Sequence, residues 1–569
     1  MKFELRQSPG VESIESDPIL QYWVAFDRST AGAFALLKFQ VLDRARYNKY
    51  SVVVMLFYLF ALCLLPIHLY CEDISVTNLL KSKDFQLTPA SYQGRFRPAK
   101  AAADLWHKDF PSPDIGAAPS PELNYKNSMQ TMQKEQLSPK AISQALETRY
   151  PLRERLRETS QGTLYLIPGK YLPGEWYGLS SLKIQVYDSE QNSLRPIGNF
   201  TLYSTERFRK IQSLYLELEN AHHLQSQDQH ALAEQLGTEL LEGYAQLAGA
   251  TYAEAYGKAL HYPSIQQLKA ELFLISTPLV AACLALYALA LCFLFVTPSL
   301  GTLFFAGAFF LHTAVLGLRC YVLQRPPVSN MLETMIYVPW FTSFAGLLLY
   351  AKTRNSLPIL ASSVTALTIL TLLQTTQTHS GLENLQAVLD SQYWLIIHVL
   401  LVVGSYGAFI LSAVMGHIYL LSWCIYKTET PAMESWIRLV KQTMYIGLSL
   451  LIPGTILGGV WAAESWGRFW DWDPKESWAF ISICVYLIWV HAYRFHAITN
   501  FGLAVGSVAG LAAISFTWYG VNYILGAGLH SYGFGNGGEL YYYLFLLAEG
   551  LFLGFVIRKK NAQNPIFPV

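Results

Sequence analysis

Five of the chain's fourteen tryptophans lie between residues 461 and 478. They are Trp461, Trp466, Trp470, Trp472 and Trp478. Tryptophan favours the membrane interface, which accounts for one or two such residues at the end of a membrane helix. Five in one stretch need a further reason, and flat indole rings bury a large planar aromatic ligand by offset stacking. We therefore expect this stretch to form a platform for such a ligand.

The end of the tryptophan stretch has the pattern of a helix start. Asp473 suits the N-cap, Pro474 suits the first helical position, and Glu476 follows three residues after the cap. A structural role for Asp473 and Glu476 is therefore favoured over catalysis. The N-terminus of this helix also attracts anions, and Arg468 and Lys475 add positive charge beside it. We expect these groups to receive acidic groups of the ligand.

Two histidines indicate that the planar ligand is haem, because neutral imidazole is a common axial ligand of haem iron. His398 lies near the start of one apolar run, and His530 follows the end of another. A lone histidine at a membrane edge is more often only hydrogen-bonded. Two of them on the same side as the tryptophans favour iron ligation, so we expect His398 and His530 to hold haem b over the indoles.

His491 is predicted to lie at a different depth. In a helix that begins at Pro474 it is about 25 Å from the helix start, too far to share an iron with His398. An ionisable residue inside a membrane span is a functional candidate, so His491 indicates a second, inner haem site. Candidate partners for it are His68, His312 and His417. The expected depths of His68 and His312 argue against these two, although His68 stays among the candidate haem-binding residues.

Membrane-spanning helices are expected to position these residues. The chain has 569 residues, of which 52% are hydrophobic and 14% are charged, whereas soluble proteins carry about 25% charged residues. Ten apolar runs are long enough to span a bilayer, at about 50–71, 271–296, 300–320, 331–350, 356–376, 393–424, 443–460, 476–493, 498–518 and 539–557. The predicted fold class is an all-α polytopic membrane protein with about ten transmembrane helices.

Lysines and arginines near the ends of these runs predict the orientation. With ten spans the following twelve fall on one face, the cytoplasmic one: Arg44, Arg46, Lys49, Lys352, Arg354, Lys427, Arg438, Lys441, Arg494, Arg558, Lys559 and Lys560. Both termini are then cytoplasmic, and the tryptophan stretch faces the periplasm or exterior. The predicted location is the cell inner membrane, with lipid around the spans.

Four regions follow from this topology. They are a cytoplasmic segment 1–49, a retained anchor 50–71, an external domain 72–270 and a membrane domain 271–560 that contains the loop 461–478. The external domain is expected to be mixed α/β or mostly helical. Its residues 111–150 have the composition of a flexible stretch, 162–203 alternate like strands, and 207–260 have the spacing of one or two amphipathic helices.

Charge and cysteine content exclude other classes. The net charge is +1, so nothing indicates nucleic acid as a partner. None of the seven cysteines lies in 72–270, which excludes a disulfide framework there. The chain has no Cys-x-x-Cys-His motif, so it is not itself a c-type cytochrome.

With these residues in view, the stretch from Trp466 to Trp478 resembles the WWD signature of the CcsA/ResC haem-handling proteins, in the variant that ends Trp-Asp-Pro-Lys-Glu. Three further stretches resemble the same family: Pro327–Glu333, Trp394–Val399 and Gly528–Gly533. The resemblance covers roughly residues 300–557.

The resemblance implies half of a system II cytochrome c synthase, a haem lyase. Such a protein takes haem from the cytoplasmic side, passes it outward and holds it for attachment to the Cys-x-x-Cys-His of an apocytochrome c. His398 and His530 match the two external histidines of the family, and His491 matches the inner one. A thioredoxin-like protein that reduces thiols is an expected partner.

The chain departs from the full synthase because no complete ResB/CcsB half precedes the matching part. A ResB/CcsB-type partner is therefore expected, and the second inner histidine could come from it. Two alternatives stay open, a haem transporter or relay without ligation chemistry and a b-type haem protein that transfers electrons. The Pro-Lys-Glu ending of the motif favours the synthase.

Overall fold

The computed structural model describes residues 86–87, 89–92, 95–98, 165–170, 175–188, 193–223, 228–255, 258–376, 382, 391–526 and 539–563. Within these residues nine helical segments are long and apolar enough to cross a membrane. They are α12 (Leu279–Val296), α13 (Pro298–Leu323), α14 (Met331–Thr353), α15 (Leu357–Thr376), α17 (Leu400–Tyr426), α18 (Pro431–Trp466), α19 (Pro474–Arg494), α20 (Asn500–Ser515) and α21 (Glu539–Gln563).

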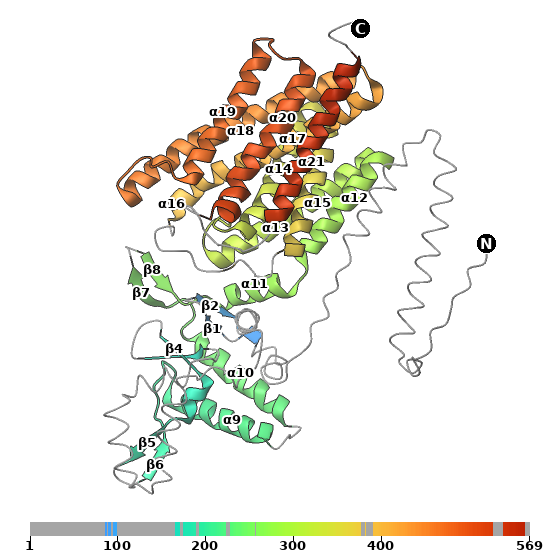
Figure 1. Ribbon diagram of the computed structural model, residues 1–569. Coiled ribbons are helices and arrows are strands. Elements are labelled where there is room, and N and C mark those ends of the chain that lie inside the picture. Colours follow the sequence, from blue (N-terminus) through green and yellow to red (C-terminus); the bar gives the residue numbers. More distant parts are fainter. Residues whose placement is uncertain are drawn as a thin grey trace, which may run out of the picture. The chain divides into compact units, whose positions relative to one another are not determined.

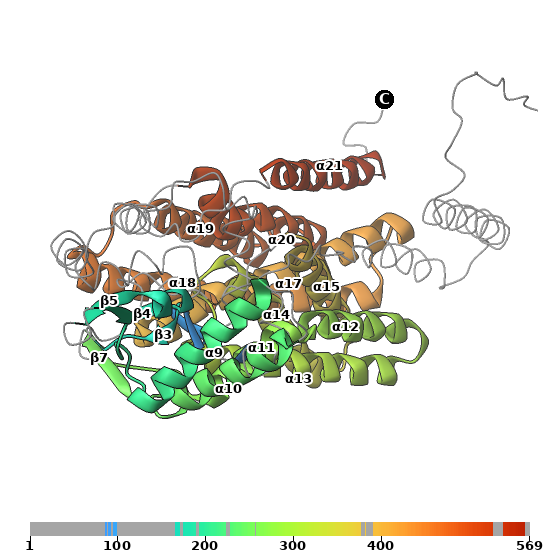
Figure 2. The same ribbon diagram turned by 90° about the horizontal axis from the view of Figure 1, so that it is seen from below.

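Nine of the ten predicted spans thus have a counterpart, and the tenth, 50–71, lies outside the described residues. The chain is a polytopic helical membrane protein. Figures 1 and 2 show α12 to α21 side by side from two directions. Where the described connections between consecutive helices are short, neighbours run in opposite directions. Residues of the loops after α13 and α18 line one cavity together with residues 395–399 and 518–522, and we call this end of the bundle the tryptophan end.

Two spans carry short extensions of unusual helix type. The one-turn α16 (Gln392–Trp394) and the π-helix η3 (Leu395–Val399) precede α17, and the π-helix η4 (Phe516–Leu525) continues α20. A π-helix is wider than an α-helix and is often found at functional sites. Both π-helices lie at the tryptophan end.

The predicted span 271–296 is wrong as one continuous helix. The structure divides it into α11 (Ile265–Ser276) and α12, with Thr277 in an extended conformation between them. Pro278 explains the break, because proline disfavours helical backbone in the residue before it and has no N–H to donate.

The predicted span 443–460 is too short at both ends. Helix α18 has 36 residues, a length of about 54 Å against about 30 Å for the bilayer core. Arg438 and Lys441 therefore lie in the helix rather than in a loop. Trp461 and Trp466 also belong to α18 and Trp478 belongs to α19, so the expected loop 461–478 is reduced to residues 467–473.

The chain before α11 contains strands and two helices. Strands β1 (Pro89–Tyr92), β2 (Arg95–Pro98), β3 (Tyr165–Pro168) and β4 (Trp176–Gly178) form an antiparallel sheet in the order β2-β1-β3-β4. The 3₁₀-helix η1 (Leu179–Lys183) follows β4, and β5 (Gln185–Asp188) pairs with β6 (Ser193–Pro196). The strands expected within 162–203 are therefore present. Their position outside the membrane stays a prediction.

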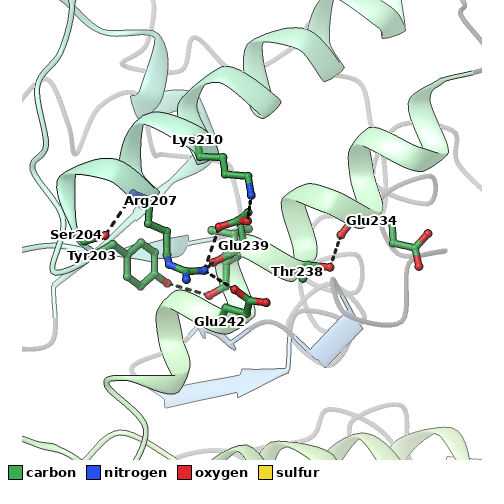
Figure 3. A network of polar contacts seen from close by, with 9 residues as sticks. Tyr203, Ser204, Arg207, Lys210, Glu234, Thr238, Glu239 and Glu242 are labelled. Atoms are coloured by element: carbon green, nitrogen blue, oxygen red, sulfur yellow. Dashed lines mark hydrogen bonds and ion pairs between the residues drawn. The ribbon is translucent and has the colours of Figure 1, made fainter.

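Helices α9 (Thr205–His223) and α10 (Gln229–Ala245) lie side by side and are joined by ion pairs (Figure 3). Arg207 Nη1 lies 3.0 Å from carboxylate oxygens of both Glu239 and Glu242, and Lys210 also pairs with Glu239. The region in which one or two amphipathic helices were expected thus contains two helices.

The prediction of helix over 207–260 is wrong at the C-terminal end of that range. There β7 (Thr251–Ala255) and β8 (Lys258–His261) form a hairpin. Gly249 has a φ of +79°, which turns the chain away from helical geometry before the hairpin. Thr251 and Tyr252, which follow, favour strands.

A buried carboxylate joins the end of α13 to the start of α14. Glu333 is 0% exposed, and its Oε2 lies 3.1 Å from Arg325 Nη1 while its Oε1 lies 3.9 Å from Arg319 Nη2. Ser329 donates to the same Oε2 from its backbone N at 2.8 Å and from its Oγ at 2.7 Å. This network holds the loop that follows α13 at the tryptophan end.

Replacing the buried carboxylate should destabilise the protein. Glu333→Ala leaves two buried guanidinium groups without their counter-charge, which typically costs about 3–5 kcal/mol. We expect a clearly lower thermal unfolding midpoint of the detergent-purified chain. Glu434→Ala, in the exposed first turn of α18, serves as the control and should change the midpoint little. Equal midpoints for both variants would contradict a stabilising role for this network.

Candidate functional site

A cavity of about 1080 Å³, counting its open mouth, lies at the tryptophan end. Five segments line it: 328–334, 395–406, 455–461, 470–479 and 518–522. Most lining residues are apolar, among them Val328, Leu395, Val402 and Trp461. A mostly apolar cavity with a few polar groups is typical of a small-molecule or cofactor site.

His398 reaches this cavity from η3. Its Nδ1 lies 2.7 Å from the carbonyl oxygen of Gly454. A carbonyl can only accept, so Nδ1 carries the proton and donates it. In the neutral ring the lone pair is then on Nε2. Metal-binding histidines commonly have their other nitrogen fixed in this way, and the geometry therefore suits iron ligation through Nε2.

Gly458 allows the imidazole to lie against α18. A Cβ atom placed on Gly458 would lie 2.5 Å from His398 Cε1 and 3.0 Å from Nδ1. Real atoms do not approach so closely, so any larger residue would displace the ring. Glycine at 458 is thus a requirement of the histidine's position.

Trp461 forms the wall next to the histidine. Its ring is stacked on that of Trp394, with centroids 6.4 Å apart and planes 13° apart, and it lies edge-on to His398 at 5.8 Å. Trp394 Nε1 in turn donates to Glu464 Oε2 at 2.8 Å. This chain of contacts ties α16 and η3 to α18.

The five tryptophans do not form one flat platform. Trp461 and Trp470 line the cavity. Trp472 is 71% exposed, and its ring is perpendicular to that of Trp470, at 87°. Trp466 is the last residue of α18, and Trp478 packs against Phe516 with centroids 4.2 Å apart. The expected side-by-side arrangement is therefore wrong for Trp470 and Trp472.

The predicted helix start is confirmed at Pro474. Asp473 accepts from Lys475 N at 2.9 Å, and Glu476 Oε2 accepts from Asp473 N at 3.3 Å, which completes a capping box. Arg468 pairs with Asp471. Asp473 and Arg468 are not among the residues that line the cavity, whereas Lys475 and Glu476 are.

Lys475 links α19 to the opposite wall. Its Nζ donates to the carbonyl oxygens of Thr517 at 2.8 Å and Trp518 at 3.1 Å, at the start of η4. Trp518 lines the cavity and donates from Nε1 to Thr334 Oγ1 at 2.9 Å. Lysine can donate three hydrogen bonds, so this ammonium both supports η4 and faces the cavity.

Several lining residues were not predicted from the sequence, namely Tyr406, Thr334, Trp518 and Asn522. The predicted span 498–518 ended at Trp518, whereas η4 continues to Leu525. A tryptophan at the end of a span is typical of a membrane-interface residue. No local sequence pattern indicates that a π-helix continues beyond it. The family-like stretch from Pro327 to Glu333 was the available signal for Thr334.

The other predicted histidines lie elsewhere. His491 is exposed near the C-terminal end of α19, and its Nδ1 donates to Leu487 O at 2.7 Å. His312 is 1% exposed and bonds Ile336 O at 2.9 Å. His417 lies 3.0 Å from Glu549 Oε2. His530 and His68 lie outside the described residues.

Known proteins match the part of the chain that builds this cavity. Residues 328–530 match the family described as cytochrome C assembly protein. CcsA of Trachelium caeruleum is 30% identical over 247 residues, which are 36% of this chain and 77% of that protein. CcsA of Prochlorococcus marinus (strain MIT 9313) is 30% identical over 269 residues, 41% of this chain and 83% of that protein. The chain belongs to the CcsA family.

This membership gives the chain a role in cytochrome c maturation, and the family implies haem handling. Protein NrfI of Wolinella succinogenes is 38% identical over 237 residues, 40% of this chain and 25% of NrfI. The chain thus matches only a quarter of NrfI. All lining residues of the cavity fall within the 328–530 match, whereas strands β1 to β8 fall outside it.

Gly458→Ala in this CcsA-family chain should displace His398 and lower the haem retained on purification. The added methyl group lies where the imidazole now is, and overpacking of this kind typically costs about 1–3 kcal/mol. Gly317→Ala on α13 is the matched control, because a Cβ there meets nothing within 4 Å. Haem per protein, measured by absorption, checks the prediction. Equal haem content in the two variants would show that the close approach does not matter for binding.

Proposed function

We propose that this chain moves haem b outward across the inner membrane and holds it in the cavity for covalent attachment to the Cys-x-x-Cys-His of apocytochrome c. One observation carries the proposal. Three family-like stretches far apart in the chain line one apolar cavity, and His398 meets it with its tautomer set for iron ligation.

The haem ring would lie in the apolar part of the cavity. Trp461 and Trp470 supply aromatic contacts, and aromatic pairs contribute about 0.5–1.5 kcal/mol beyond their burial. His398 supplies one axial ligand through Nε2. His530, which follows η4 in the sequence, supplies the second. Trp466, Trp472 and Trp478 then support the loop or meet the apocytochrome rather than contact the ring.

The ligation reaction needs little chemistry from the chain itself. Each substrate thiol adds its S–H across a haem vinyl group, so that a C–S bond forms and the vinyl carbons gain one hydrogen. The thiols belong to the apocytochrome, and the chain contributes position and orientation, which accelerate such additions strongly. A thioredoxin-like protein would keep the two thiols reduced.

His491 fits an inner haem site. It lies near the end of α19 remote from the cavity and is exposed. Its exposure allows a second ligand from another chain, and a ResB/CcsB-type partner is the proposed source. His68 is the candidate within this chain. His312 is a poor candidate because it is buried and bonded to Ile336 and Tyr287.

Removing the axial ligand should abolish cytochrome c maturation. His398→Ala, co-expressed with a ResB/CcsB-type partner and an apocytochrome, should yield no covalent haem. Added imidazole should restore part of the yield, because it can fill the vacated axial position. His496→Asn is the control: His496 is exposed just beyond the end of α19 that is remote from the cavity, and asparagine tolerates its φ of +56°. Normal maturation by His398→Ala would remove His398 from the ligand set.

The inner site can be tested by haem content. If haem enters at His491 and moves outward, His491→Ala should deplete haem from the whole protein, because the cavity is intact but not supplied. His398→Ala should retain haem at the inner site only. Absorption spectra of both variants, prepared from the same cells, measure the difference. Parental haem content in His491→Ala would show instead that the cavity loads from outside.

A further inference from the structure

Asn522 presents an unsatisfied amide at the cavity. It lies on η4 and lines the cavity. Its Oδ1 is buried, and no hydrogen-bond donor reaches it from the described residues. Buried polar groups in folded proteins nearly always have a partner, so such a group needs an explanation. An apolar side chain would fill the same position without this penalty, which indicates that the amide serves a ligand.

Lys475 lies against the same part of η4. In a π-helix the backbone N–H of each residue donates to the carbonyl of the fifth residue before it, which for Asn522 is Thr517. The Lys475 ammonium donates to that same carbonyl at 2.8 Å. Asn522 thus lies about one turn along η4 from the two carbonyls that Lys475 bonds, and both residues line the same cavity.

Other cations at this end are committed to carboxylates. Arg468 pairs with Asp471, and Arg325 pairs with Glu333. The described lining residues include Lys475 but no arginine. Among the described residues, Lys475 bonds only to carbonyl oxygens and forms no ion pair within 4 Å. An acidic ligand group in the cavity would thus be attracted to this place.

We propose that Asn522 and Lys475 together bind a carboxylate of the cavity's ligand, which under the proposed function is a haem propionate. The ammonium donates one hydrogen bond. The amide donates a second from Nδ2 after a half-turn, since its two ends are nearly equal in shape. This inference rests on the proposed function and adds to it the residues that recognise the acidic edge of haem.

The consequence is a fixed direction for the vinyl edge of the ring. The two propionates of haem lie on one side of the macrocycle, and the two vinyl groups are borne by the pyrroles on the other side. A propionate held at η4 therefore turns the vinyl side away from η4. The vinyl edge would then be presented to the apocytochrome thiols, and Asn522 would help to set this direction.

The test uses hemin and hemin dimethyl ester, in which both propionates are neutral. The detergent-purified full chain is titrated with each, and the ratio of the two affinities is measured. The parent protein should bind hemin roughly 10- to 100-fold more tightly than the ester, as expected for a hydrogen bond to a charged group. Asn522→Leu should reduce this preference several-fold. Asn522→Asp, which preserves shape and adds negative charge, should reduce it further.

Gln442→Leu is the matched control. Gln442 also has a buried side-chain oxygen that no described donor reaches, but it lies on α18 outside the cavity lining. Its variant should keep the parental preference. If both Asn522 variants also keep the parental preference for hemin, or if their affinities for hemin and for the ester fall equally, the carboxylate site is overturned. The proposal that the cavity holds haem would not be affected by that result. If the parent binds neither compound, the proposed function itself fails.

Discussion

The hydrogen bond from His398 Nδ1 to the Gly454 carbonyl controls the geometry of the cavity. At 2.7 Å it requires the imidazole to touch the backbone of α18, and Gly458 leaves room for it one turn later. The same approach brings Trp461 edge-on to the imidazole. Orientation of the ring, its tautomer and the adjacent aromatic wall all follow from one contact between η3 and α18.

The two π-helices explain how polar groups and an apolar cavity coexist. In lipid, backbone groups must find partners within the protein, and a wide helical turn leaves some of its carbonyls available to side chains. Lys475 meets two such carbonyls at the start of η4, and Thr517 Oγ1 donates to Trp478 O at 3.0 Å. Side chains close to the cavity therefore stabilise its walls.

Ionisable residues inside the helices differ in what they contact. His312 is enclosed by Tyr287 and Ile336, and His417 is paired with Glu549 across α17 and α21. These partners satisfy both side chains within the bundle. His491 differs because its ring is exposed, which leaves it accessible to a ligand or another chain. Partners and exposure, more than depth in the membrane, separate packing histidines from candidate ligands.

The sequence alone determined the features that depend on neighbouring residues. Apolar runs of about 20 residues predict spans because each must cover the bilayer thickness, and nine such spans are present among the described residues. The helix start at Asp473, Pro474 and Glu476 was predictable because a cap needs only residues a few positions apart. The tryptophan stretch and His398 were likewise correctly placed at one end of the bundle.

Only the tertiary structure decided which of these residues face the cavity. The length of α18 moved Trp461 and Trp466 onto a helix, and η4 brought Trp518 and Asn522 to the wall. His398 and Gly454 are 56 residues apart, and no local pattern links them. The physical reason is that hydropathy depends on the composition of one segment, whereas the contacts that shape a binding cavity depend on how separate segments pack against each other.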